Sequence, residues 1–351
     1  MIEIHPKRRT GYFVANNLSN LTARFNLKVN WEVERKYVAN LTRTAVASAK
    51  SANCDVLVAM GWIPYCRLKE ELPVLYWGDA TIGQRLDKAP HWSNLSRRTR
   101  DRAESFERQA FGRLDAVVMA SHWAVVDVQE RYGISPEKVK RIPFGANITD
   151  PGLSSRRWNG ATLRILTVGV KWHRKGIDTA VLAVDALKRS GLDVRLDVVG
   201  VRPPDSTWER PYVRYWGFLS KEDEDDAAVL SNLYATRDIF LLPTRNDPFC
   251  LVVAEAAAFG MPVISTDTGG VPERIDRGGI LVPVESPPSV FAEAIRKVVT
   301  DEVEYERFSL GAVQDFHDRT SWPTSSEQLL ELCRSMVDFS RGVNGDSMEG
   351  A

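Results

Sequence analysis

The sequence predicts an α/β protein built from two doubly wound parallel sheets. Its 351 residues exceed the ~100–200 residues that one domain usually holds, so we expect two domains. Short β-rich runs alternate with helical segments along most of the chain, which favours parallel βαβ units. Several of these runs end at a glycine, and ligands of doubly wound sheets bind at the carboxyl ends of the strands.

The second half of the chain shows the alternation most regularly. Its predicted strands are 164–168, 194–199, 213–216, 238–242, 262–265 and 280–282. Its predicted helices are 176–189, 221–234, 251–259, 288–300 and 302–313. Gly169, Gly200 and Gly217 each follow a strand, and Gly260 closes a helix. Glycines therefore mark the edge of the sheet at which a ligand is expected.

The first half repeats this pattern less completely. Its predicted strands are 55–59, 74–77, 116–120 and 139–142, and its predicted helices are 97–113 and 122–132. Before residue 55 the apolar residues Val14, Leu18, Leu21 and Phe25 recur at helical spacing. A doubly wound domain usually opens with a strand, a glycine loop and a helix. We therefore expect the first domain to lack that opening unit.

The domain boundaries follow from composition. The segment from Phe144 to Gly160 is rich in Gly, Pro, Asn and Ser, which predicts a linker. We expect an N-terminal domain over 1–148, a C-terminal domain over 160–322, a helix over 323–340 and a disordered tail over 341–351.

The two halves differ in charge, although the whole chain has 46 basic and 46 acidic residues and no net charge. Residues 1–150 carry 23 basic and 16 acidic side chains, so 23 − 16 = +7. Residues 151–351 carry 23 basic and 30 acidic side chains, so 23 − 30 = −7. Oppositely charged halves fit two domains with different partners.

Composition also bounds the class of protein. A hydrophobic content of 44% excludes a mainly disordered chain. No apolar run approaches the ~20 residues of a membrane span, and the N-terminus has no apolar core of a signal peptide. The four cysteines Cys54, Cys66, Cys250 and Cys333 form no CxxC pair, which argues against disulfides or structural zinc. We expect a cytoplasmic protein.

The segment 243–260 carries the strongest chemical signal. A strand ends at Pro243, a loop turns, and a helix is predicted to start near Phe249. The backbone N–H groups and positive dipole end of such a helix form a ready phosphate site. Asp247 before Pro248 is equally explained as a helix cap, and Glu255 as a solvated helix residue. Spacing alone leaves these alternatives open.

A second loop, from Gly169 to Gly176, lies between a strand and a helix. Lys171, Arg174 and Lys175 fall within it and could neutralise a diphosphate, although a solvated charged loop explains each one singly. Two weaker signals are Thr268-Gly269-Gly270-Val271-Pro272-Glu273, whose paired glycines allow close backbone approach, and Asp79, which follows a strand and is equally explained as a cap. Tyr215, Trp216 and Phe218 fit either a base contact or packing.

These segments together carry a family resemblance. The run DPFCLVVAEAAAFGMPVISTDTGGVPE resembles the nucleotide-sugar signature of family 4 glycosyltransferases, which are retaining enzymes of the GT-B type with two Rossmann-like domains. VGVKWHRKGID resembles the diphosphate loop of that family, and KVKRIPFGAN resembles its strand before the interdomain hinge. The resemblance extends over roughly residues 55–322 and is most specific in the second half.

The resemblance implies roles for individual residues. Glu255 would bind the donor ribose, Asp247 would contact the transferred sugar, and Lys175 with Arg174 would bind the diphosphate. Backbone around Phe249, Cys250 and Leu251 would cradle sugar and phosphate, and Lys171 and Gly169 complete the expected donor loop.

Three positions depart from the pattern of the family. Asp247 replaces the usual Glu and is one methylene shorter, and Val170 stands where many members have Arg. Gly78-Asp79 occupies the place of the usual His-Asp, which leaves Asp79 as the candidate on the first domain. Lys171 or Arg174 would therefore supply the charge that is missing at position 170.

The implied activity is transfer of a sugar, with retention, from a nucleotide diphosphate sugar to a glycan or lipid-linked acceptor. No metal cofactor and no nucleic-acid partner are expected. Arg97, Arg98, Arg100 and Arg102 would let the basic first half touch an anionic membrane, although a solvated helix face explains them as well. The alternatives are a non-catalytic nucleotide-sugar-binding or interaction protein, and an epimerase, for which we identify no carboxylate and His set.

Overall fold

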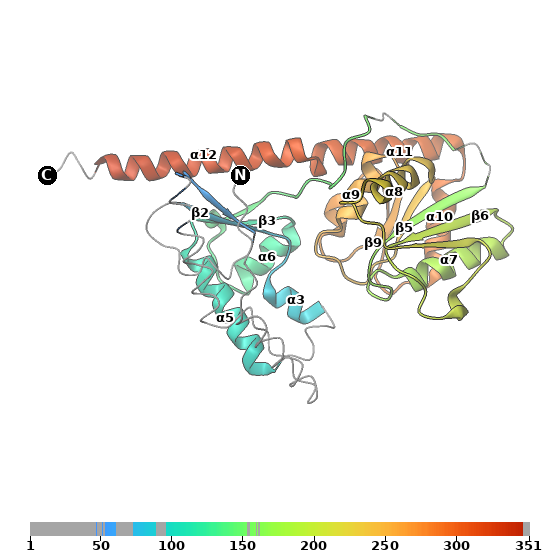
Figure 1. The fold of residues 1–351 in the computed structure, drawn as a ribbon, viewed down its shortest axis with the longest axis horizontal. Coiled ribbons are helices and arrows are strands. Elements are labelled where there is room, and N and C mark those ends of the chain that lie inside the picture. Colours follow the sequence, from blue (N-terminus) through green and yellow to red (C-terminus); the bar gives the residue numbers. More distant parts are fainter. Residues whose placement is uncertain are drawn as a thin grey trace. The chain divides into compact units, whose positions relative to one another are not determined.

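The computed structural model describes residues 53–60, 73–88, 96–152, 155–158, 160 and 162–346, together with positions 47 and 51. The chain divides into two compact units (Figure 1). The first unit comprises residues 1–142 and 327–351, and the second comprises residues 143–326. The helical pattern expected before residue 55, and with it the expected missing opening unit, lies outside the described residues.

The first unit contains a four-stranded parallel sheet in the order β1-β2-β3-β4. Its strands are β1 Leu57–Ala59, β2 Val74–Gly78, β3 Ala116–Met119 and β4 Val139–Arg141. Its helices are α3 Ile82–Lys88, α5 Arg97–Arg113 and α6 His122–Glu130, with a 3₁₀ turn at Pro136–Lys138. Phe111 lies at the centre of its core, with its ring 5.4 Å from that of Tyr76 and 5.3 Å from that of Tyr132.

Helix α3 was not predicted, although its start carries a recognisable signal. Thr81 and Gln84 form a reciprocal capping box: the Thr81 N–H donates to the Gln84 side chain and the Gln84 N–H to the Thr81 hydroxyl, both at 3.1 Å. The carboxylate of Glu107, on α5, accepts a further hydrogen bond from the Ile82 N–H at 2.7 Å. The helix is only seven residues long, so it depends on this tertiary cap and shows little periodicity.

The same Glu107 predicts a pH dependence of stability. It is completely buried, and burial raises its pKa to about 8, an effect that its hydrogen bonds from Tyr132 and Ile82 reduce but do not cancel. A raised native pKa stabilises the fold fully below the unfolded-state value, and this contribution is lost as the pH rises through about 8. Glu107→Gln should therefore flatten the decline in stability between roughly pH 5 and pH 8.5.

Hydrogen exchange of the β2 and β3 amides, followed across this pH range, measures the effect within the first unit. Glu104→Gln is the matched control, because Glu104 lies on the same helix but its side chain is 32% exposed. If the Glu107 and Glu104 variants keep the same pH profile as the unchanged protein, the buried carboxyl does not control stability here.

The second unit contains a six-stranded parallel sheet in the order β10-β9-β8-β5-β6-β7. Its strands are β5 Leu163–Val168, β6 Val194–Val199, β7 Val213–Gly217, β8 Ile239–Leu242, β9 Val263–Thr266 and β10 Gly279–Val282. Its helices are α7 Ile177–Arg189, α8 Glu224–Thr236, α9 Leu251–Ala258, α10 Pro288–Val298 and α11 Glu302–Asp315. Short 3₁₀ turns lie at Ser206–Trp208 and Val271–Arg274, and a π-helical turn at Phe316–Thr320.

Helices cover both faces of this sheet, as a doubly wound fold requires. Leu163 and Ile165 of β5 pack with α7 and α10 in one core, whereas Leu166 and Val168 pack with α8 and α9 in the other. Figure 1 shows the two groups of helices on opposite sides of the strands. Because both faces are buried, the strands are continuous apolar runs such as Ile239–Leu242.

Helix α12 runs from Trp322 to Asp346. It therefore extends into the segment 341–351 that composition predicts to be a disordered tail, and that part of the prediction is wrong up to Asp346. The remaining residues, 347–351, lie outside the described part of the chain.

Candidate functional site

Loops at the carboxyl ends of the strands in the second unit are joined through their main chains. The Gly200 N–H, after β6, donates to the carbonyl of Gly217 at the end of β7 at 2.6 Å. The Gly169 N–H, after β5, donates to the Val199 carbonyl at 2.8 Å. Two further bonds continue the series: Arg245 N–H to Arg174 carbonyl at 2.9 Å, and Gly270 N–H to Asp247 carbonyl at 3.2 Å. The loops after five strands thus form one connected rim.

A buried ion pair lies at the centre of this rim. The Lys175 ammonium donates to Oδ2 of Asp247, and both residues are buried, with 8% and 6% of their surfaces exposed. The Arg174 guanidinium lies 3.6 Å from the same oxygen. The other carboxylate oxygen of Asp247 accepts the N–H groups of Cys250 at 2.7 Å and Phe249 at 3.2 Å. Sequence analysis predicted all five of these residues, and the structure brings them together.

The environment keeps both members of the pair charged. Burial by itself would raise the pKa of Asp247, but the charge and hydrogen bond of Lys175 lower it below its ordinary value. Burial would lower the pKa of Lys175, but the neighbouring Cys250 and Asp247 raise it above its ordinary value. The Cys250 thiol, which is also buried, has its pKa raised to about 12. A lysine–aspartate ion pair beside a neutral thiol therefore occupies the site at neutral pH.

The start of helix α9 agrees with the predicted range 251–259 and lies two residues after Phe249. Its first residue is Leu251, and Cys250 precedes it in the left-handed conformation, with φ 56° and no side-chain cap. Asp247 is therefore not the N-cap of this helix: its carboxylate binds the two N–H groups of the loop that leads into it. The first turn of α9 consequently presents main-chain N–H groups at the same edge of the sheet as Lys175.

Glu255 is buried, with 1% of its surface exposed, so it is not a solvated helix residue. One carboxylate oxygen accepts a hydrogen bond from the Lys221 ammonium, and the other accepts one from the Tyr234 hydroxyl at 3.0 Å. Burial and the nearby Glu255 charge raise the pKa of Tyr234 well above its ordinary value, so the hydroxyl stays protonated and donates. Sequence analysis missed Lys221 and Tyr234 because they lie 34 and 21 residues away along the chain.

The remaining loop residues shape the rim. A side chain at Gly169 would meet the aliphatic part of Lys175 at 2.7 Å, so the glycine leaves room for that lysine. Lys171 is exposed, and its carbonyl accepts the Lys175 N–H at 2.9 Å. Gly269, at φ 57°, lies so close to the Asp247 carbonyl that a Cβ would approach its oxygen to 2.1 Å. The glycines of 268–270 therefore hold the main chain of Asp247.

Of the three aromatic residues after Arg214, only Phe218 is well exposed, at 69%. The Trp216 indole donates to Asp197 at 2.7 Å, and the Tyr215 hydroxyl donates to the Trp208 carbonyl at 2.8 Å. Packing therefore explains Tyr215 and Trp216.

Asp79 belongs to the first unit, at the end of β2. Its carboxylate pairs with Arg85 at 2.6 Å, and a third of its side chain is exposed (34%). Asp79 follows strand β2 as the sequence predicted, and its role as the candidate site residue of the first domain stays a prediction.

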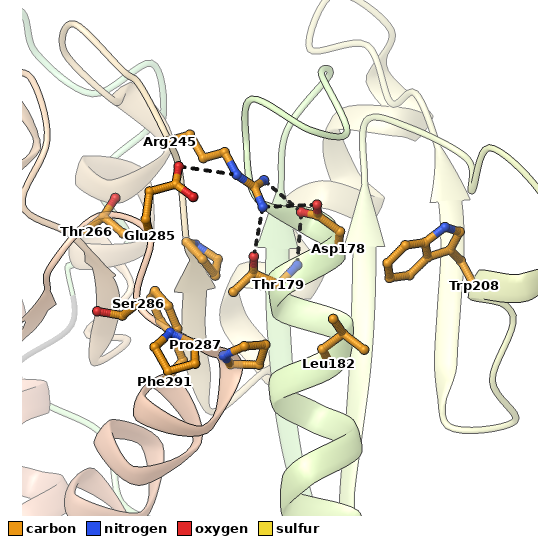
Figure 2. A pocket seen from close by; sticks show the side chains of 12 residues that line it. Asp178, Thr179, Leu182, Trp208, Arg245, Thr266, Glu285, Ser286, Pro287 and Phe291 are labelled. Carbon is orange, nitrogen blue, oxygen red and sulfur yellow. Dashed lines mark hydrogen bonds and ion pairs between the residues drawn. The ribbon is translucent and has the colours of Figure 1, made fainter.

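A pocket of about 260 Å³ opens on the same edge of the second sheet (Figure 2). It lies where the starts of α7 and α10 meet the ends of β8 and β9. Its lining consists of Asp178, Thr179, Leu182, Trp208, Pro243, Arg245, Thr266, Glu285, Ser286, Pro287, Pro288 and Phe291. None of the predicted site residues lines this pocket, but Arg245 connects it to the loop of Lys175.

Over the described ranges, no group of three or more His, Cys, Asp or Glu side chains is arranged to hold a metal ion. Likewise, none of the helices in the described part combines the length and apolar character of a membrane span.

Known proteins resemble this chain in fold and in sequence. Sucrose-phosphate synthase from Thermosynechococcus elongatus superimposes with a TM-score of 0.67 at 19% identity, over 86% of this chain and 78% of that one. Anabaena HepE, solved with UDP and glucose, gives a TM-score of 0.61 at 18% identity, over 86% and 81% of the two chains. These likenesses show that the protein has the GT-B fold.

The sequence comparisons agree. Residues 162–301 match the family described as glycosyl transferases group 1. D-inositol 3-phosphate glycosyltransferase of Corynebacterium glutamicum (strain R) is 28% identical over 265 residues, which are 70% of this chain and 62% of that protein. Alpha-D-kanosaminyltransferase of Streptomyces kanamyceticus is 24% identical over 320 residues, or 84% and 79% of the two chains. The chain spans 62%, 59% and 55% of the length of three corynebacterial relatives.

Proposed function

We propose that the protein is a retaining glycosyltransferase whose second unit binds a nucleoside diphosphate sugar. The observation that carries this proposal is the buried Lys175–Asp247 pair beside the first turn of α9, at the carboxyl edge of the sheet. A cation and a helix N-terminus at one place suit a diphosphate, which carries negative charge on several oxygens. HepE, which shares the fold, was solved with UDP-glucose.

Each group has a distinct task in the proposed reaction. The acceptor oxygen forms a bond to the anomeric carbon, the bond from that carbon to the diphosphate breaks, and the acceptor proton leaves with the departing phosphate. Acceptor attack comes from the face that the nucleotide leaves, so the configuration is retained. Lys175, Arg174 and the N–H groups around Leu251 stabilise the negative charge that develops on the diphosphate.

The two carboxylates hold the rest of the donor. Glu255 accepts hydrogen bonds from the ribose hydroxyls, because each of its oxygens retains acceptor capacity beside Lys221 and Tyr234. Asp247 contacts the transferred sugar while Lys175 is shared between this carboxylate and the phosphate. Phe249, Cys250 and Leu251 line the donor with their main chain, and Gly169 and Lys171 complete the diphosphate loop. Asp79 serves the acceptor side.

A thermal-shift panel tests the donor site. UDP, GDP and ADP, each compared with its 2′,3′-dideoxy form, should reveal one base that stabilises the protein, with the deoxy form bound roughly tenfold more weakly. Glu255→Gln should remove most of that difference, because an amide accepts more weakly than a carboxylate. Absence of any shift contradicts the proposed donor site. A shift without sugar transfer or donor hydrolysis would make the protein a nucleotide-sugar-binding protein instead of an enzyme.

The proposed acceptor is a glycan or a lipid-linked sugar, reached in the cytoplasm at the membrane face. Helix α5 carries Arg97, Arg98, Arg100 and Arg102, of which Arg97 and Arg98 are exposed. Binding to vesicles that contain anionic lipid should weaken as salt is raised, because exposed charges are screened. Sedimentation with such vesicles measures the binding at each salt concentration. A lack of binding at low salt removes the membrane contact from the proposal.

A further inference from the structure

The Arg245 side chain hydrogen-bonds residues on both sides of Lys175, in the loop before helix α7 and in the first turn of that helix. Its guanidinium donates to the His173 carbonyl at 2.6 Å. It also donates to the Asp178 carboxylate at 2.9 and 3.1 Å (Figure 2). A further bond reaches the Thr179 hydroxyl at 3.3 Å. His173 lies two residues before Lys175, and Asp178 and Thr179 lie three and four residues after it. Arg245 therefore binds the chain on both sides of the residue that carries the ammonium.

The main chain of Arg245 adds a second connection. Its N–H donates to the Arg174 carbonyl at 2.9 Å, so one residue after β8 holds the residue directly before Lys175. The side chain of Arg245 is 25% exposed, and Glu285 lies 3.7 Å away from its Nε on the opposite side. A planar guanidinium can bind a carbonyl, a carboxylate and a hydroxyl at once in a fixed geometry, which a lysine ammonium cannot reproduce.

We propose that Arg245 is a positioning residue for diphosphate binding. This inference rests on the proposed function, because the ligand that benefits is the nucleoside diphosphate. Arg245 acts through the loop: it fixes His173, Arg174 and Asp178, and thereby the place of the Lys175 ammonium against Asp247. The effect should be specific to the phosphate end of the donor, since Glu255, at the proposed ribose end, is held independently by Lys221 and Tyr234.

Arg245→Met and Arg245→Lys test this role, with Arg210→Met as the matched control. Arg210 also pairs with an aspartate of α7, Asp185, at 3.2 Å and donates to the Thr207 carbonyl at 2.8 Å. It therefore controls for the loss of an equivalent ion pair on the same helix. The probes are UDP, GDP and ADP, each compared with its monophosphate by calorimetry.

For the nucleotide that binds, Arg245→Met should reduce the ratio of monophosphate Kd to diphosphate Kd by roughly ten- to a hundredfold, because misplacement of about 1 Å is costly. Arg245→Lys should rescue little of it, and Arg210→Met should leave the ratio unchanged. Hydrogen exchange of the amides of 171–177 should be faster in the Arg245 variants only.

The possible outcomes distinguish failure of the role proposed for Arg245 from failure of the proposed function. If the unchanged protein binds a nucleoside diphosphate and the ratio is the same in Arg245→Met, Arg245 has no positioning role. If the monophosphate and diphosphate weaken equally, the arginine has only a general structural role, and the inference is again overturned. If the unchanged protein binds none of these nucleotides, the proposed function fails and the inference fails with it.

Discussion

Lys175→Met should lower kcat/KM for sugar transfer by about 10²–10³-fold, because it removes a preorganised cation from the leaving diphosphate. The substitution keeps an unbranched side chain, one atom shorter, but removes its charge and its hydrogen bond to Asp247. Transfer or donor hydrolysis, assayed with the nucleotide sugar that the thermal-shift panel identifies, measures the effect. Lys188→Met is the control: Lys188 pairs with Asp193 at 3.0 Å near the other end of α7 and should leave turnover unchanged.

The same substitution should also destabilise the protein. Removal of one partner of a buried ion pair leaves an uncompensated charge and typically costs about 3–5 kcal/mol. Lys175→Met combined with Asp247→Asn should recover most of that stability, since an amide at position 247 still accepts the Cys250 N–H. It should not recover turnover. Urea denaturation with activity assays separates the two effects, and normal turnover in either variant would rule out a role for the Lys175 charge.

Gly176→Ala should have the largest structural effect of any small substitution at the site. Gly176 precedes α7 at φ 65°, and a Cβ there would lie 1.8 Å from the carbonyl oxygen of Pro243. Because the obstacle is main chain of the neighbouring β8 loop, no side-chain rearrangement removes the clash. We expect a loss of stability beyond the roughly 1–2 kcal/mol that the left-handed conformation alone costs an alanine, and with it loss of diphosphate binding.

Gly191→Ala separates the cost of the left-handed backbone conformation from the cost of the steric clash. Gly191 follows the other end of α7 at φ 87°, and a Cβ there would meet nothing within 4 Å. Its substitution should therefore cost only the conformational term, about 1–2 kcal/mol. Thermal and urea unfolding of both variants measure the difference. Equal losses in the two variants would mean that the Pro243 carbonyl moves away at little cost.

Much of the fold could be predicted from sequence because the strands of a doubly wound sheet are continuous apolar runs. Helix α5 and strand β6 have the predicted bounds, Arg97–Arg113 and Val194–Val199. Helix α3 could not be predicted from periodicity, because this short helix is specified by the capping box of Thr81 and Gln84. Asp247 could be interpreted as a helix cap because Asp-Pro resembles a helix start, whereas its carboxylate binds the N–H groups of a loop that faces Lys175.

The site was predictable only in part. Lys175 and Arg174 carry a local signal because they lie beside Gly176 in the loop after β5, and Asp247 carries one because it precedes Pro248 in the loop after β8. The partners of Glu255 do not: Lys221 and Tyr234 reach it from other elements, and nothing in their local sequence indicates a carboxylate. Arg245 was overlooked for the same reason, because its contacts with His173 and Asp178 depend on how the β5 and β8 loops lie together.

The rim of the second sheet is held by main-chain bonds, from Gly217 through Val199 and Arg174 to Asp247. The side chains of Arg245 and Lys175 also hold the β5 and β8 loops together. A residue such as Phe218 can therefore be exchanged in the course of evolution without disturbing the distances between the loops. In the proposed donor site, exposed side chains of this kind are the positions at which a preference for base or sugar can change while the main-chain bonds of the rim stay as they are.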